Sequence, residues 1–154
     1  MKPSLFLRIA AIVAFLYFAG HTAGAPWTPI KGPGEMAALE ALKARRFAAQ
    51  GFTRTYWDFY VGFGVAISGF LLVQAVALWQ LASLAKRDAF RVRPIVASFI
   101  VAYVFNAIVA WKYFFPVPAL FAAVITICLG LAFFYLRNGK SADRAEPSGL
   151  GANG

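Results

Sequence analysis

Long apolar stretches are the feature that most constrains this chain. From Phe59 to Ala85 no charged residue occurs, and a helix of about 20 residues crosses the ~30 Å apolar layer of a bilayer. Three further stretches are similar, so the expected membrane-spanning helices cover residues 4–21, 57–85, 94–112 and 118–136. Since lipid leaves no partner for free backbone groups, such stretches are helical. The sequence predicts an all-α, polytopic membrane protein, a four-transmembrane-helix bundle forming a single domain over residues 1–136.

Composition excludes several other classes of protein. Of 154 residues, 61% are hydrophobic and 14% are charged, against about 25% charged in soluble domains. Such a chain is neither a soluble domain nor a disordered one. The single cysteine, Cys128, can form no intrachain disulfide and no cysteine-based metal or redox site. No nucleotide-binding loop, HExxH motif or serine-hydrolase elbow occurs, and no cofactor is expected.

The segments outside the spans differ in character. The long first loop begins with Pro26, Pro29, Gly32 and Pro33, which disfavour regular structure. From Glu35 to Gln50 it is rich in good helix formers, and a short extramembrane helix is predicted over residues 35–50. The last segment, residues 137–154, contains proline and several glycines but no aromatic residue, which is typical of a disordered tail.

The N-terminus has two interpretations. A basic start, an apolar core and Ala23-Gly24-Ala25 resemble a secretory signal peptide with its cleavage site. Pro26 directly after that site is a poor cleavage context, and the apolar stretch from Leu5 is long for a signal core. The sequence leaves open whether residues 1–25 are removed or form the first span.

The net charge of +9 comes mainly from residues between the apolar stretches. There it indicates topology and contact with lipid headgroups rather than nucleic-acid binding. With four spans, both termini and the loop between spans two and three share one side. That side carries nine basic residues and the other side six: Lys2, Arg8, Lys86, Arg87, Arg91, Arg93, Arg137, Lys140 and Arg144 against Lys31, Lys43, Arg45, Arg46, Arg54 and Lys112. The positive-inside rule predicts an inner-membrane protein with both termini in the cytoplasm.

Small and polar residues predict which helix faces turn inward, because membrane helices pack closely where side chains are small. Each span carries one such row at helical spacing. The rows are Ala10, Ala14, Tyr17 and His21; Asp58, Gly62, Val65 and Gly69; Ser98, Ala102, Asn106 and Ala110; and Ala122, Thr126 and Gly130.

Polar members of these rows suggest a site near the outer boundary. His21 ends the first span and Asp58 begins the second, while Asn106 lies about 6–9 Å inside the third. A histidine held by a carboxylate can act as a general base, which makes His21 and Asp58 the candidate catalytic residues. Tyr17, Trp27, Tyr60, Asn106 and Trp111 are the candidate ligand-binding residues, suited to a flat lipophilic molecule.

The same residues also have a structural interpretation. His21 and Asp58 lie at helix ends that headgroup water reaches, and tryptophan and tyrosine at that level form an ordinary aromatic belt. Asn106 can bridge two helices. Three functions follow as hypotheses. They are a membrane protein that binds a lipophilic ligand, a membrane-embedded isomerase or oxidoreductase acting on a lipid-like substrate, and an accessory or assembly subunit that meets a membrane partner or a second copy.

The stretch Gly20-His21-Thr22-Ala23-Gly24 at the end of the first span, followed by three further spans, resembles small bacterial four-helix membrane proteins of unknown function. More loosely, the layout is similar to that of the DoxX-like group. The resemblance rests on this one stretch and on the order of the spans. It implies a four-helix bundle and no particular reaction.

Overall fold

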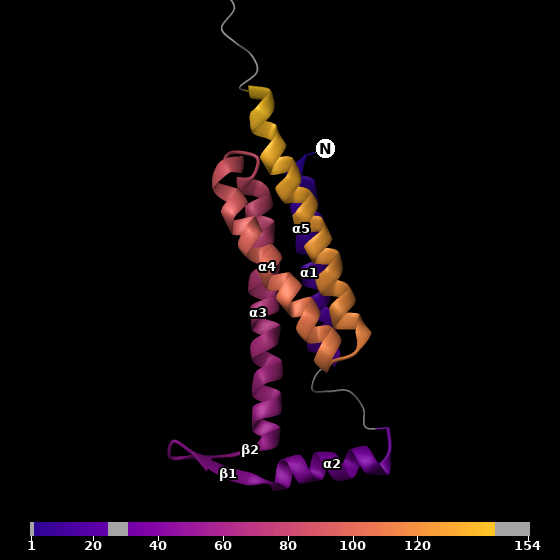
Figure 1. The fold of residues 1–154 in the computed structure, drawn as a ribbon. Helices are drawn as coiled ribbons and strands as arrows, with labels where there is room; N and C mark the ends of the chain where they lie inside the picture. Colours follow the sequence, from indigo (N-terminus) through magenta and orange to yellow (C-terminus); the bar gives the residue numbers. More distant parts are fainter. Residues whose placement is uncertain (1, 25–30, 144–154) are drawn as a thin grey trace, which may run out of the picture. The chain divides into compact units, whose positions relative to one another are not determined.

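The computed structural model describes residues 2–24 and 31–143, with residues 138–143 described by their backbone alone. In chain order the elements are α1 (Pro3–Gly24), α2 (Pro33–Ala44), β1 (Arg46–Ala49), β2 (Phe52–Thr55), α3 (Tyr56–Leu84), α4 (Ala89–Tyr113) and α5 (Pro116–Asp143) (Figure 1). Helices α1, α3, α4 and α5 are long and apolar enough to cross a membrane. The predicted fold class is confirmed: the chain is an all-α, multi-pass membrane protein, and the short helix α2 lies between its first two spans.

The helices divide into two compact units, Met1–Ala14 with Gln74–Gly154, and Phe15–Val73. The first unit joins the start of α1, the end of α3, and the antiparallel pair α4 and α5. All four helices contribute to its core. Its largest fully buried side chains are Leu7, Leu78, Val92, Val96, Tyr103, Ile125 and Leu129. Since lipid is as apolar as these side chains, close packing rather than transfer from water favours the arrangement.

The buried faces only partly follow the predicted rows. Ala10, Ala14 and Tyr17 are buried as expected. On α3, however, Gly62, Val65 and Gly69 are exposed. The buried residues lie on a different face of the helix. They are Leu71, Ala75, Leu78, Leu81, Ala82 and Ala85. On α4, Ser98 and Ala102 are exposed, and on α5 Gly130 is exposed. The predicted row is thus mostly buried on α1, exposed on α3, and buried only in part on α4 and α5.

Helix α4 begins earlier than predicted. The sequence places its start at Pro94, because proline suits the first turn of a helix, but the helix begins at Ala89. Asp88 caps it: the Asp88 side chain accepts a hydrogen bond from the Arg91 amide at 3.1 Å and forms an ion pair with Arg91 Nε at 3.1 Å. Asp88 thereby satisfies one free amide of the helix N-terminus. Pro94 lies in the second turn of the helix.

The loop helix is shorter than predicted. Helix α2 ends at Ala44, and residues 46–55 form an antiparallel hairpin in which Arg46 pairs with Thr55 and Ala49 with Phe52. The two turn residues, Gln50 and Gly51, have φ angles of 51° and 83°. Positive φ at both positions is the requirement of a type I′ hairpin turn. The predicted short helix is present as α2, and residues 46–50 of its predicted range belong to the hairpin instead, since Gln50 and Gly51 close this turn.

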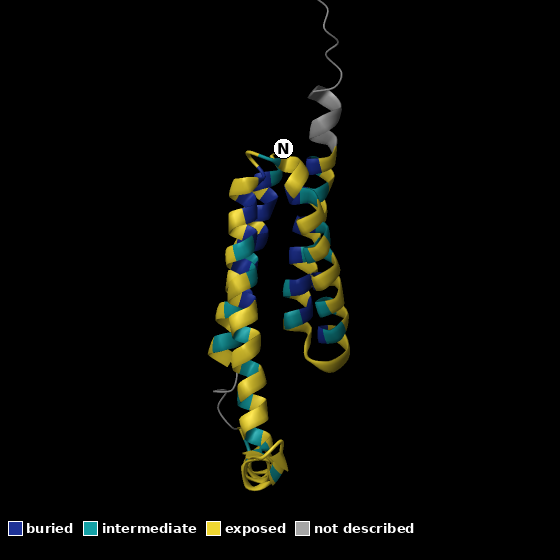
Figure 2. Cartoon of the chain, turned by 90° about the vertical axis from the view of Figure 1, so that its left-hand side faces the viewer, coloured by how far each residue is buried: buried dark blue, intermediate teal, exposed yellow. Residues whose placement is uncertain are grey.

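The hairpin leads directly into α3, and both elements belong to the second unit. Phe47 of β1 contacts Tyr56 and Phe59 of α3, with ring centroids 5.0 Å and 5.2 Å apart. Lys43 of α2 lies over the Trp57 ring at 5.3 Å. In Figure 1, α2 and the hairpin extend from the start of α3, and Figure 2 shows most of this region as exposed. Aromatic and cation–π contacts thus pack α2 and the hairpin against the first turns of α3. We call Lys43, Phe47, Tyr56, Trp57 and Phe59 the platform.

Replacing Gly51 with alanine is expected to loosen this hairpin. A Cβ at φ 83° is strained, and the cost is about 1 kcal/mol. Hydrogen exchange of the amides of residues 46–55 should accelerate about fivefold, while exchange in α4 and α5 stays unchanged. Substitution of Gly34 in α2, where a Cβ meets open space, is the matched control. Equal protection in the Gly51 variant and the parent protein would contradict the turn assignment.

The C-terminal prediction is partly corrected. Helix α5 continues past Leu136 to Asp143, so residues 137–143, which the sequence assigns to a disordered tail, are helical. The remaining tail residues, 144–154, lie outside the described part of the chain. Residues 25–30, which include Trp27 and the end of the possible cleavage site, lie outside it as well.

Candidate functional site

Three polar side chains from two membrane-spanning helices meet in the second unit. Nδ1 of His21 on α1 lies 3.1 Å from Oγ of Ser68 on α3. The Thr22 hydroxyl donates to the same Ser68 oxygen at 2.9 Å. All three side chains are half-buried. We call His21, Thr22 and Ser68 the polar cluster.

The helices place this cluster just inside one boundary of the apolar layer. Helix α3 has 29 residues, more than the roughly 20 that a bilayer requires. Counting about 20 residues back from Leu84 reaches Val65, which leaves Ser68 within the layer and the first turns of α3 beyond it. His21 lies in the last turn of α1, at the same end of the apolar layer as Ser68.

The hydrogen bonds of the polar cluster have a direction. Ser68 accepts from Thr22, and in one tautomer of His21 it donates its own hydroxyl hydrogen to Nδ1. A neutral imidazole that accepts at Nδ1 carries its proton on Nε2. The His21 side chain makes no other hydrogen bond within the described residues. In this tautomer the cluster offers an N–H donor just inside the boundary of the apolar layer.

Asp58 has a different role from the one that its position in the sequence suggests. Its carboxylate accepts a hydrogen bond from the Thr55 amide at 2.7 Å, and its amide donates to the Thr55 hydroxyl at 3.1 Å. This reciprocal pair is a capping box that begins α3. Asp58 precedes Ser68, the partner of His21, by ten residues, about 15 Å of helix. The structure brings His21 together with Ser68 and not with Asp58.

Two predicted ligand-binding residues belong to the same unit as the polar cluster. Tyr17 is 8% exposed and lies one turn before His21 on the same face of α1. Tyr60 is exposed and stacks on Trp57 with ring centroids 5.4 Å apart. Since Trp57 also carries Lys43 on its ring, Tyr60 contributes to the platform rather than to the polar cluster. Tyr17 is the predicted residue that stays close to the donor of His21.

The other predicted residues lie elsewhere. Asn106 is half-buried on α4, and Trp111 is 77% exposed near the end of that helix, both in the first unit. Trp111 lines an open hollow on α4 together with Ala107, Ile108 and Lys112. Trp27 falls outside the described residues. The convergence of these side chains with His21 in one pocket stays a prediction.

Ser68 is the member of the polar cluster that the sequence did not single out. It is the one serine or threonine between Asp58 and Gln80, and in an apolar span such a hydroxyl usually bonds to its own helix. Ser98 and Thr126 do so, donating to the carbonyl oxygens of Pro94 and Ala122 at 3.1 Å and 2.8 Å. A row at helical spacing could have indicated Ser68 as a residue that faces α1. That row is Trp57, Val61, Gly64 and Ser68.

Comparison of the chain with models of protein families, with curated proteins and with solved structures gave no match. Among the residues that the structure describes, no three histidine, cysteine, aspartate or glutamate side chains gather as a metal site. The chemistry of the polar cluster therefore has to be inferred from its own donors and acceptors.

Proposed function

We propose that this chain is an inner-membrane protein, with both termini in the cytoplasm, that binds a lipophilic ligand at the polar cluster. The observation that carries the proposal is the hydrogen-bond chain from Thr22 through Ser68 to His21. In the tautomer with the proton on Nε2, the Ser68 hydroxyl and Nδ1 of His21 bond to each other within the protein. The Nε2 hydrogen is then left to donate to a ligand. Polar groups at membrane depth are costly unless a partner satisfies them.

The chemistry of this donor selects a class of ligand. An N–H group at the edge of the apolar layer fits an acceptor such as the carbonyl oxygen of a quinone or ketone, whose hydrocarbon part lies in the bilayer. The exposed aromatic side chains Phe15 and Phe63, in the same spans as the cluster, offer apolar contact for such a chain. The ligand would be bound rather than converted, because the carboxylate that was expected to orient His21 caps α3 instead.

A decylquinone carrying a diazirine in its alkyl chain tests the proposal in lipid nanodiscs. Photolabelling should map to residues 15–24 and 61–71. In His21→Phe, labelling should fall about tenfold, the consequence of losing a hydrogen bond of about 1.4 kcal/mol in an apolar setting. Ser98→Ala is the matched control, because Ser98 bonds only within its own helix, and its labelling should equal that of the parent protein.

A second readout separates ligand binding from helix packing. The quinone should raise the melting temperature of the parent protein and not that of His21→Phe. If His21→Phe lowers the melting temperature without ligand but labels like the parent protein, the cluster only joins two helices and the proposal is wrong. Labelling spread evenly over the exposed faces of α4 and α5 would contradict it as well.

A further inference from the structure

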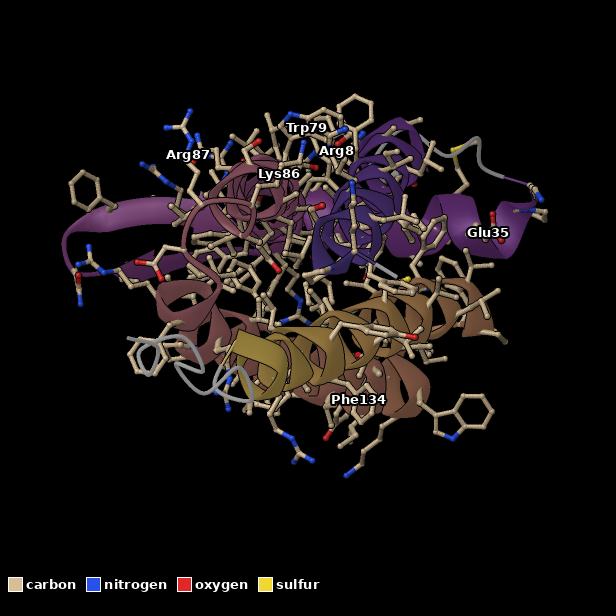
Figure 3. All side chains as sticks on the ribbon, turned by 90° about the horizontal axis from the view of Figure 1, so that it is seen from above. Arg8, Glu35, Trp79, Lys86, Arg87 and Phe134 are labelled. Carbon is tan, nitrogen blue, oxygen red and sulfur yellow. The ribbon has the colours of Figure 1, made fainter. Side chains whose placement is uncertain are left out.

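Basic side chains gather where α3 ends and α4 begins in the first unit. Within residues 2–14 and 74–137, Asp88 is the only acidic residue. Its carboxylate already forms an ion pair with the Arg91 side chain and accepts a hydrogen bond from the Arg91 amide. Lys86 and Arg87 directly follow the end of α3, and Arg8 of α1 lies 5.4 Å from the Trp79 ring centroid on α3 (Figure 3). Within those residues the remaining cations have no carboxylate to neutralise them, so an external anion is favoured there.

Arg93 is the least exposed of the described basic residues at this end. It is half-buried on α4, and its guanidinium carbon lies 5.6 Å from the ring centroid of Phe133 on α5. Its Nε atom is buried and has no hydrogen-bond partner among the described residues. A buried donor without an acceptor is costly. The contact with Phe133 holds the guanidinium at the ring, and its N–H groups can donate to a planar or tetrahedral oxyanion.

A second guanidinium lies at the same level. Arg137 follows Phe133 by four residues on α5 and is exposed, so both side chains project from one face of the helix. Because α4 and α5 pack against each other, Arg93 contacts Phe133 from α4, and Arg137 lies one helical turn beyond Phe133 on α5. Two guanidinium groups beside one another repel unless an anion lies between them.

We infer that Arg93, Phe133 and Arg137 form a binding site for the phosphate of an anionic phospholipid. The surroundings favour a lipid over a free anion. Arg93 lies in the second turn of a membrane-spanning helix, and the neighbouring side chains Phe90 and Phe134 are 61% and 50% exposed. Figure 3 shows Phe134 pointing outward from α5. A headgroup bound by the two arginines would place its acyl chains against these apolar surfaces.

The test uses the full chain purified in mild detergent, with lipid adducts counted by native mass spectrometry. Phosphatidylglycerol should bind more tightly than phosphatidylcholine. Arg93→Gln and Arg137→Gln should each weaken phosphatidylglycerol binding about tenfold, because each removes a charge-assisted hydrogen-bonding group. Arg91→Gln is the matched control. Arg91 carries the same charge two residues from Arg93, but Asp88 already pairs with it, and binding should stay within about twofold of the parent protein.

Three outcomes would overturn the assignment. Equal binding of the two lipids would exclude a headgroup site. Equal losses in Arg91→Gln and Arg93→Gln would indicate diffuse attraction to a basic surface. Displacement of phosphatidylglycerol by millimolar inorganic phosphate would indicate a site for the free anion. Arg137 is exposed, so its glutamine variant should melt like the parent protein without lipid, and it keeps the test valid if Arg93→Gln fails to fold.

Discussion

Replacing Ala82 with phenylalanine is expected to destabilise the protein by about 3 kcal/mol or to prevent its folding, because a large ring must enter a packed core. Ala82 is fully buried, and it lies one turn from Leu78, which is also fully buried. Membrane helices gain stability where small residues let their backbones approach, and a bulky side chain separates them. The measurement is the melting temperature and the monodisperse yield of the variant in detergent.

Gly69→Ala is the matched control on the same helix. Gly69 belongs to the row that the sequence predicts to face inward, but a Cβ at this position meets nothing within 4 Å. Alanine forms helices better than glycine by about 1 kcal/mol, so this variant should melt at the same temperature or higher. A stable Ala82→Phe together with a damaged Gly69→Ala would show that the glycine row is the packed face after all.

Neutralising the loop between α3 and α4 is expected to produce two orientations of the protein. Lys86, Arg87 and Arg91 supply three of the nine basic residues on the proposed cytoplasmic side, while the opposite side carries six. With these three changed to glutamine the two sides carry equal numbers, and the difference that orients the chain disappears. Labelling of a single cysteine in the hairpin turn should then fall to roughly half of the molecules.

Neutralising basic residues on the other side of the membrane provides the control. Changing Lys43, Arg45 and Arg46 to glutamine lowers the charge of the segment around α2 and β1 and increases the difference between the sides. This variant should keep a single orientation. If the triple variant of the α3–α4 loop also keeps a single orientation, the charge difference does not determine the topology.

The four spans could be predicted because each is an apolar stretch of sufficient length. Their boundaries depend on single side chains that hydropathy does not capture. Asp88 caps α4, which begins at Ala89, five residues before the proline that was expected to begin it. Gln50 and Gly51 turn the chain back where alanine and arginine favour a helix. In both places a local hydrogen bond or a backbone angle outweighs helix propensity.

The candidate site was harder to predict than the fold. His21 was identified because it ends the first span on the face of small residues, yet its partner depends on which faces of α1 and α3 meet. That face differs by one residue from the predicted row, so Ser68 rather than Gly69 points toward α1. A shift of one residue rotates the contact by about 100°. Since small residues occur on several faces of α3, they do not determine which face meets α1.

The central claim is that the α2–hairpin segment and the α3–α4 loop lie on opposite sides of the membrane, with the loop in the cytoplasm. Single cysteines at Gln50 and Arg87, in a background where Cys128 is serine, test it directly with an impermeant maleimide applied to intact cells. The account predicts labelling at position 50 without permeabilisation and labelling at position 87 only after it. Labelling of both positions from outside, or of position 87 alone, would contradict it.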